Sequence, residues 1–103
     1  MATKTATLTA DDITSVVIGG ASTDGAYRLI YEAFRGSSYD GGEIICNVRE
    51  TPDVPLSEHF RNNLGVDDIT SEISGANYVL KFDVDDSSAD DITLYYNTEI
   101  IRK

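Results

Sequence analysis

The chain is poor in the residues that build covalent or metal-linked frameworks. Its 103 residues include one cysteine, one histidine, two prolines and no tryptophan. The single cysteine, Cys46, cannot form a disulfide within the chain, so stability must come from packing and hydrogen bonding. One His and one Cys do not suffice for a zinc site made by a single chain. We expect no metal and no cofactor.

Basic residues and long apolar runs are also scarce. Eight Lys and Arg stand against 18 Asp and Glu, which gives a formal charge of -10. Such a charge opposes direct binding to nucleic acid or anionic lipid, favours cationic or neutral partner surfaces, and also keeps an abundant protein soluble. No apolar stretch approaches the ~20 residues of a membrane helix. The first four residues, Met1 to Lys4, lack an apolar run, so we expect no signal peptide.

The sequence also lacks a catalytic set. The only possible base for a cysteine nucleophile, His59, lies in a separate predicted element. Ile44, Cys46 and Val48 follow strand spacing, which predicts that Cys46 is buried and inert. No phosphate-binding glycine loop is present. We therefore predict that the protein is not an enzyme and takes no small-molecule substrate.

One acidic stretch has some features of a calcium loop. Oxygen-bearing side chains alternate at Asp83, Asp85 and Ser87, but the sixth position is not glycine and Leu94 occupies the place of the closing glutamate. We interpret the stretch from 85 to 91 as a solvated turn whose side chains cap their own backbone. It should bind calcium weakly or not at all.

A short motif occurs twice. The pentapeptide Asp-Asp-Ile-Thr-Ser spans residues 11–15 and again residues 67–71, and a leucine precedes each copy by three positions, at Leu8 and Leu64. Downstream, residues 25–47 can be aligned with residues 75–97 at a constant offset of 50. Six pairs are identical in that alignment: Gly25/Gly75, Ala26/Ala76, Ser37/Ser87, Ser38/Ser88, Asp40/Asp90 and Asn47/Asn97. We infer an internal repeat of approximately residues 8–50 and 64–101 within a single domain, 1–103.

The repeat predicts a mainly β fold. Apolar residues alternate over 78–84 and again over 92–96, on either side of a polar turn, which indicates a hairpin. The first copy should then form a hairpin from 27–34 and 43–49, although residues 26–35 also fit helical spacing. A short helix is predicted over 55–65, because Leu56, Phe60 and Leu64 share a face. The expected architecture is a small sandwich or barrel made of two pseudo-symmetric hairpin units with this helix between them.

The function suggested by these features is structural. A threonine-rich opening, a small acidic β domain and no catalytic set resemble small virion proteins of tailed phages, such as capsid decoration or tail components. The resemblance implies a non-enzymatic, multi-copy assembly module located in the virion or cytoplasm. The alternative is an acidic inhibitor that mimics nucleic acid and occupies a basic protein surface.

The expected partner is another protein or further copies of the chain. If Ile92, Leu94 and Tyr96 face the core, the other face of the last strand exposes large apolar groups. We therefore select Tyr31, Tyr95 and Ile101 as interface candidates. Burial of these three in a second core layer or under the predicted helix is the competing interpretation.

Overall fold

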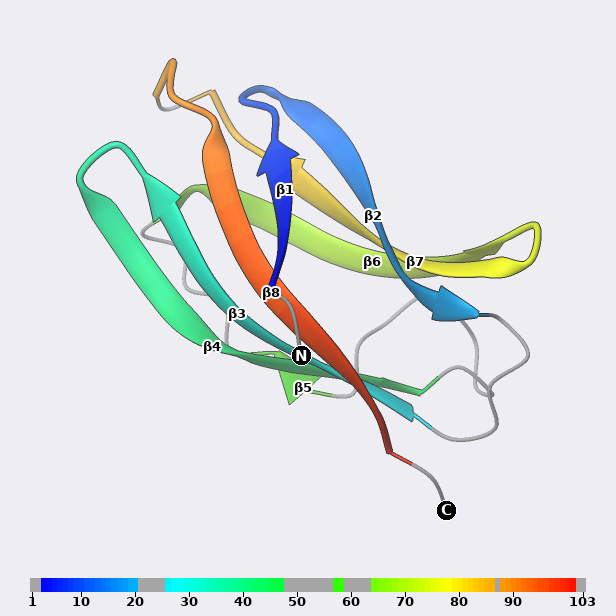
Figure 1. Cartoon of the computed structure of the whole chain (residues 1–103). Helices are drawn as coiled ribbons and strands as arrows, with labels where there is room; N and C mark the ends of the chain where they lie inside the picture. The colour runs from blue at the N-terminus through cyan, green and yellow to red at the C-terminus, as the bar shows by residue number, and fades with distance from the viewer. Residues whose placement is uncertain (1–2, 21–25, 48–56, 59–63, 87, 102–103) are drawn as a thin grey trace.

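The fold is known from a computed structural model that describes residues 3–20, 26–47, 57–58, 64–86 and 88–101 (Figure 1). The described part of the chain is mainly β, as predicted. Its strands are β1 (Lys4–Leu8), β2 (Asp12–Gly20), β3 (Ala26–Arg35), β4 (Ser38–Asn47), β5 (Ser57–Glu58), β6 (Val66–Ser74), β7 (Asn77–Val84) and β8 (Ile92–Ile101).

The strands form two antiparallel sheets that face each other. Sheet A has the order β1-β8-β3-β4-β5, and sheet B has the order β2-β7-β6. Figure 1 shows sheet A in front of sheet B, with the β6–β7 hairpin reaching beyond it. Within the described residues, no helix is long and apolar enough to cross a membrane.

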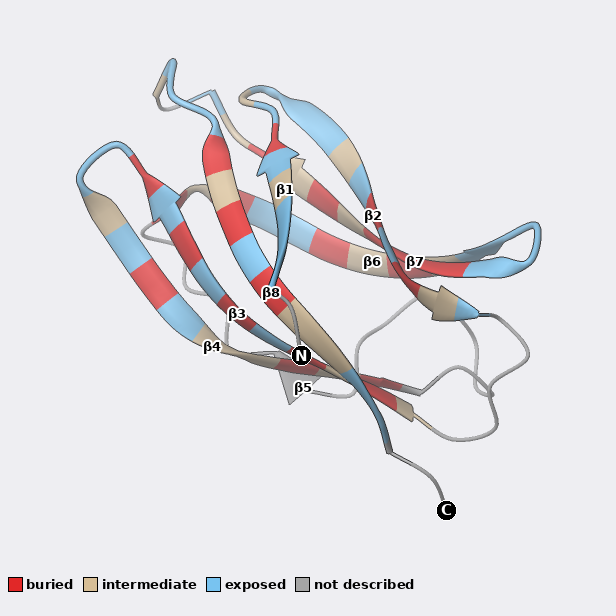
Figure 2. Cartoon of the chain, in the orientation of Figure 1, coloured by how far each residue is buried: buried red, intermediate tan, exposed pale blue. Residues whose placement is uncertain are grey.

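The core lies between the sheets and follows from the period-two pattern of the strands. Buried and exposed residues alternate along β3 and β8 in Figure 2, because successive side chains of a strand point to opposite faces. On β3 the buried apolar side chains are Tyr27, Leu29, Tyr31 and Ala33, which resolves residues 26–35 as a strand. Sheet B contributes Tyr78, Leu80, Phe82 and Val84 to the same core.

Only one of the two expected hairpins exists. β3 and β4 pair along their whole length, from Ala26 with Asn47 to Arg35 with Ser38, so the first hairpin is confirmed. The second prediction is wrong, because β7 pairs with β2 and β6 whereas β8 pairs with β1 and β3. Residues 85–91 therefore connect the two sheets. The tight turn that contains Gly75, whose φ is +62°, makes β6 and β7 the hairpin instead.

The two pentapeptides occupy equivalent strands of sheet B. The first begins β2 and the second begins β6, and both strands pair with β7, one on each side. Their registers differ by one residue. Ile13 stands opposite Asp83, whereas Ile69 stands opposite Phe82.

The helix predicted over 55–65 falls mostly outside the described residues. Where the structure describes this stretch, Ser57 and Glu58 form β5 and pair with Ile45 and Ile44 of β4, so this part is strand. Leu64 is buried in the core. Pairing with the free edge of β4 supplies backbone hydrogen bonds that a helix starting at Pro55 would not use.

Candidate docking face

The outer face of sheet A carries a group of exposed aromatic side chains. Phe34, Tyr39 and Tyr95 are 38%, 51% and 41% exposed. The Phe34 ring lies 5.0 Å from that of Tyr39 and 6.0 Å from that of Tyr95 between centroids, within the range of favourable aromatic pairs. With Glu32, which lies among them, these residues are called the aromatic face below.

The position of β3 in the middle of the sheet brings these residues together. β3 pairs with β4 on one side and with β8 on the other. The register places Phe34 opposite Tyr39 and places Glu32 opposite Tyr95. Because Tyr31 and Ala33 point into the core, Glu32 and Phe34 must point outward.

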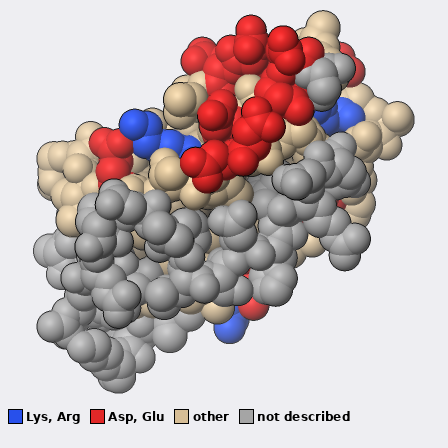
Figure 3. Space-filling model, turned by 180° about the vertical axis from the view of Figure 1, so that it is seen from behind, with Lys and Arg blue, Asp and Glu red and all other residues tan. Residues whose placement is uncertain are grey.

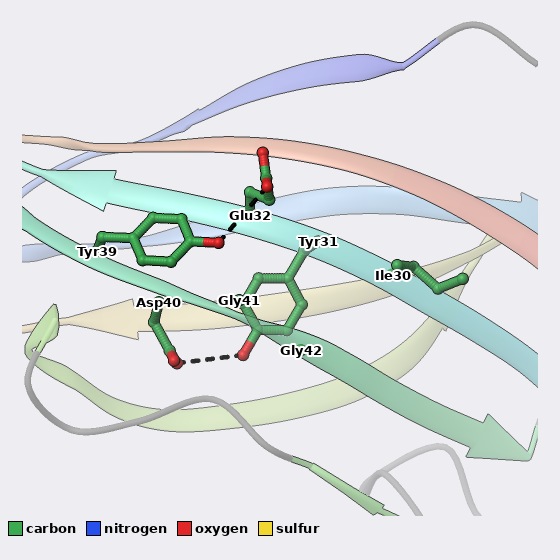
Figure 4. Close-up of a pocket in the computed structure, with 7 residues that line it drawn as sticks. All are labelled: Ile30, Tyr31, Glu32, Tyr39, Asp40, Gly41 and Gly42. Carbon is green, nitrogen blue, oxygen red and sulfur yellow. Dashed lines mark hydrogen bonds between the residues drawn. The ribbon is translucent and has the colours of Figure 1, made fainter.

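Glu32 lies at the centre of the aromatic face. On β4 its cross-strand neighbour is Gly41, which has no side chain to fill the space beside the carboxylate. The Tyr39 side chain leans over this gap, since a Cβ at Gly41 would come within 3.0 Å of the Tyr39 hydroxyl oxygen. The Tyr39 hydroxyl donates a long hydrogen bond of 3.5 Å to Glu32 Oε1 (Figure 4).

The surface around Glu32 is hollowed. Three open hollows of about 650, 610 and 270 Å³ lie on this side of sheet A, and Glu32 lines all three. Figure 4 shows the largest, where Tyr39 and Glu32 border the space above Gly41. The second is bounded by Phe34, Tyr95 and Thr93.

The acidic side chains in the other half of the same face are held in ion pairs. Arg28 Nε lies 3.2 Å from Glu43 Oε2, and Arg28 Nη1 lies 3.1 Å from Glu99 Oε1. One guanidinium thus bridges carboxylates on both neighbouring strands. Within the described part of the chain, Glu32 takes part in no ion pair. The aromatic face therefore carries an uncompensated negative charge.

The three interface candidates fall in different places. Tyr95 lies on the aromatic face and is exposed. Tyr31 is a correction, because it is 2% exposed and its hydroxyl donates to Asp40 Oδ2 at 3.3 Å inside the domain. Its alternation with Glu32 along β3 directs it to the core. Ile101 ends β8 with its backbone opposite Ala26, and its side chain lies outside the description.

Sequence reasoning missed three of the four residues of the aromatic face. The signal for two of them was available, since a strand that buries Tyr27, Leu29 and Ala33 must expose Glu32 and Phe34. Tyr39 could not be found this way. Its place beside Glu32 depends on the β3–β4 register and on the gap at Gly41.

In the stretch with calcium-loop features, oxygen atoms accept hydrogen bonds from an arginine side chain. The Arg35 side chain is 4% exposed, and its Nη1 lies 2.8 Å from Asp85 Oδ1. It also donates to four main-chain carbonyl oxygens at 2.9 to 3.0 Å, those of Leu64, Asp85, Ser88 and Asp90. These oxygens therefore already surround a cation that the chain itself supplies.

Acidic side chains gather at the end of the domain where this loop lies. Figure 3 shows them as one cluster, seen from behind. The connections at this end meet through backbone hydrogen bonds, from Asp11 N to Asp85 O at 3.0 Å and from Asp85 N to Gly65 O at 2.8 Å. Half of the chain's 18 acidic residues lie on these connections or in the strand ends next to them: Asp11, Asp12, Asp67, Asp68, Asp83, Asp85, Asp86, Asp90 and Asp91.

The residues considered for catalysis do not form a site in the described part. Cys46 is 1% exposed, which confirms its predicted burial, and His59 lies outside the described residues. Among the residues that the structure describes, no three His, Cys, Asp or Glu side chains are grouped as metal ligands.

The domain is thus a two-sheet antiparallel β protein with an aromatic, acid-centred outer face. Comparison with known proteins adds no relative, because no protein family, curated protein or solved structure matches the chain.

Proposed function

We propose that this domain is a non-enzymatic assembly module that docks on a protein partner through the outer face of sheet A. The observation that carries the proposal is the aromatic face, in which three large rings are exposed side by side on the outer surface of a sheet. Tyr and Phe in a contiguous exposed group are typical of protein interfaces, where they supply rigid contact area.

The composition of the face is more typical of a docking surface than of an exposed part of a hydrophobic core. The rings alternate with polar groups such as Glu32 and Thr93, and Tyr39 and Tyr95 each carry a hydroxyl. Such a mixed surface tolerates water in the free protein and gains from burial in a complex. The net charge of -10 opposes non-specific aggregation through the same rings.

The proposed setting is a multi-copy assembly, and a virion is the particular one that the sequence resemblance suggests. A small acidic domain with one docking face could decorate a repeated surface such as a capsid or a tail. This part of the proposal rests on the resemblance alone.

Site-specific photo-crosslinking tests the docking face. p-Benzoylphenylalanine replaces Tyr95 in one variant and Val17 in another, because Val17 is 49% exposed on the outer face of sheet B. Both variants are irradiated in extracts or particles from the native source. The residue at 95 should crosslink to one discrete protein, identified by mass spectrometry, and the residue at 17 should not. Crosslinks from 17 alone, or from neither position, would contradict the proposal.

The acidic end supports a second candidate, mimicry of nucleic acid. The fold collects acidic side chains from three connections and the adjoining strand ends into one cluster (Figure 3). Such a surface can occupy a basic site on another protein. In this case p-benzoylphenylalanine at Asp86 should crosslink to a basic protein, and excess duplex DNA should abolish the crosslink. A crosslink insensitive to DNA would argue against mimicry.

A further inference from the structure

Glu32 has neighbours that leave its carboxylate open to a ligand. Gly41 stands opposite on β4 and leaves a gap, while Tyr95 stands opposite on β8 and supplies a ring. Tyr39 borders the gap from the other side, as Figure 4 shows, and Phe34 contacts both tyrosines. A carboxylate is thus flanked by aromatic rings and lies in three open hollows.

We propose that the aromatic face binds an arginine side chain of the partner protein. The Glu32 carboxylate accepts hydrogen bonds from the guanidinium, and the rings of Tyr39 and Tyr95 contact its planar surface. This inference rests on the proposed docking function and names the group that the docking face recognises.

Three properties of the face select a cation. An ionised carboxylate can only accept hydrogen bonds, so its partner must be a donor. The faces of aromatic rings are electronegative and attract cations placed over them. The domain's charge of -10 also raises the local concentration of positive groups, and the acidic end lies close by, because Thr93 borders the second hollow two residues after Asp91.

The shape and openness of the hollows favour arginine over lysine. An ammonium is strongly hydrated and would keep its water in an open hollow, whereas a guanidinium is weakly hydrated and stacks on aromatic rings. The same face already holds one guanidinium, paired with carboxylates. Arg28 bridges Glu43 and Glu99 across β3, β4 and β8, so a guanidinium fits between carboxylates on this sheet.

A peptide titration of the full-length protein tests the proposal. The probe is Ac-Gly-Arg-Gly-NH2, added at low ionic strength to the 15N-labelled protein and followed by amide chemical shifts. The control peptide carries citrulline, which has the shape of arginine without its charge, and a third peptide carries lysine. The arginine peptide should shift the amides of Glu32, Gly41 and Tyr95, and should bind more tightly than either control.

Two matched variants separate the site from bulk charge. Glu32→Gln removes the carboxylate and keeps the rings, so it should weaken binding of the arginine peptide by about fivefold, the upper end of the range for an exposed ion pair. Glu72→Gln removes the same charge from the outer face of sheet B, where Glu72 pairs with Lys81. It should leave the affinity within about twofold, because only long-range attraction is lost.

Several outcomes would overturn the proposal. If the citrulline peptide binds as tightly as the arginine peptide, the face does not recognise positive charge. If the lysine peptide binds as tightly, the face does not prefer a guanidinium. If Glu32→Gln and Glu72→Gln weaken peptide binding equally, or if the chemical-shift changes are confined to residues 85–91, the binding is caused by net charge alone. If position 95 crosslinks to a partner but the arginine peptide does not bind, the docking function is supported and arginine recognition is wrong. If both fail, the docking function itself is wrong.

Discussion

The two copies of Asp-Asp-Ile-Thr-Ser begin in the same way and then face in opposite directions. In both, the side chain of the second aspartate accepts a hydrogen bond from the next backbone amide, at 2.8 Å from Ile13 N to Asp12 Oδ1 and at 3.0 Å from Ile69 N to Asp68 Oδ1. Yet Ile13 is 55% exposed and Ile69 is 4% exposed. Identical local sequence thus gives identical local hydrogen bonding and opposite burial.

A single extra residue explains the difference. In β6 the pairing with β7 shifts between Val66 and Asp68, which leaves Asp67 as a bulge. A one-residue slip turns every following side chain to the other face of a strand. Ile69 therefore joins the core, while Ile13, whose strand has no such shift before Val17, faces solvent. The comparison shows that facing is set by register, which the pentapeptide itself does not encode.

Inserting one alanine between Asp68 and Ile69 should have the largest effect on this comparison. The insertion moves Ile69 from a position opposite Phe82 to one opposite Lys81, so that its side chain turns outward. The same slip turns Glu72 toward the core. Exposing Ile69 and burying Glu72 should lower the free energy of unfolding by more than about 4 kcal/mol. Urea denaturation followed by circular dichroism measures this loss.

Deletion of Asp67 is the matched control, because it changes the chain length by one residue but leaves Asp68 opposite Asp83 and Ile69 opposite Phe82. It removes the bulge without changing the face of any following side chain, so it should change the stability by less than about 2 kcal/mol. If the deletion and the insertion had similar effects, register would not be the cause of the opposite facing.

Ile69→Ala should have the next largest effect. The side chain is buried against the opposite sheet, so its truncation should cost about 2–4 kcal/mol. Thermal and urea unfolding of this variant measure the loss. A cost below about 1 kcal/mol would mean that Ile69 does not lie in the core.

The buried phenol of Tyr78, which lies beside the second copy, should also make the stability of the domain fall at alkaline pH. Burial raises the pKa of Tyr78 above its usual range, and the nearby hydroxyl of Ser71, the last residue of the copy, lowers it by less. Below pH 10 the phenol is protonated in both the folded and the unfolded chain. Above it, the unfolded chain loses the proton first, so the free energy of unfolding should fall as the pH rises.

Stability measured between pH 9 and 12 tests this effect. Tyr78→Phe should reduce the slope of stability against pH in that window. Burial raises the pKa of Tyr96 as well, so Tyr96→Phe provides the comparison and should leave the Tyr78 contribution in place. A slope unchanged by Tyr78→Phe would contradict the assignment.

Ile13→Ala should have the smallest effect, although it changes the same residue in the same pentapeptide. More than half of this side chain is already in water, so the cost should be below about 0.5 kcal/mol. The same unfolding measurements apply. Equal costs for Ile13→Ala and Ile69→Ala would show that the two copies share one environment.

The sequence predicted the parts of the fold that depend on alternation within one strand. Period two identified β7, β8 and the burial of Cys46, whereas β3 and its hairpin with β4 were inferred from the repeat. It did not predict which strands become neighbours. Tyr78–Val84 and Ile92–Tyr96 have the pattern of a hairpin, but alternation says nothing of whether a following strand stays in its sheet or crosses to the other.

The candidate site was predicted in part for the same reason. Tyr95 follows from the alternation of β8, and Tyr31 was misplaced although the alternation of β3 directs it inward. The grouping of Glu32 with Tyr39 and Tyr95 requires the registers of three strands. The role of Arg35 carries no periodic signal, since its bonding partners lie 29 to 55 residues away in the chain.

Arg35 has a further consequence for how the domain opens. It lies on β3 of sheet A, but it bonds to Leu64 and Asp85, which flank β6 and β7 of sheet B, and to Ser88 and Asp90, which precede β8. Neither sheet can peel away without breaking this shared set of bonds. Core amides of both sheets should therefore exchange hydrogen with solvent in one cooperative unit, at a common opening free energy. In Arg35→Met, the core amides should separate into two groups, one for each sheet, with different opening free energies.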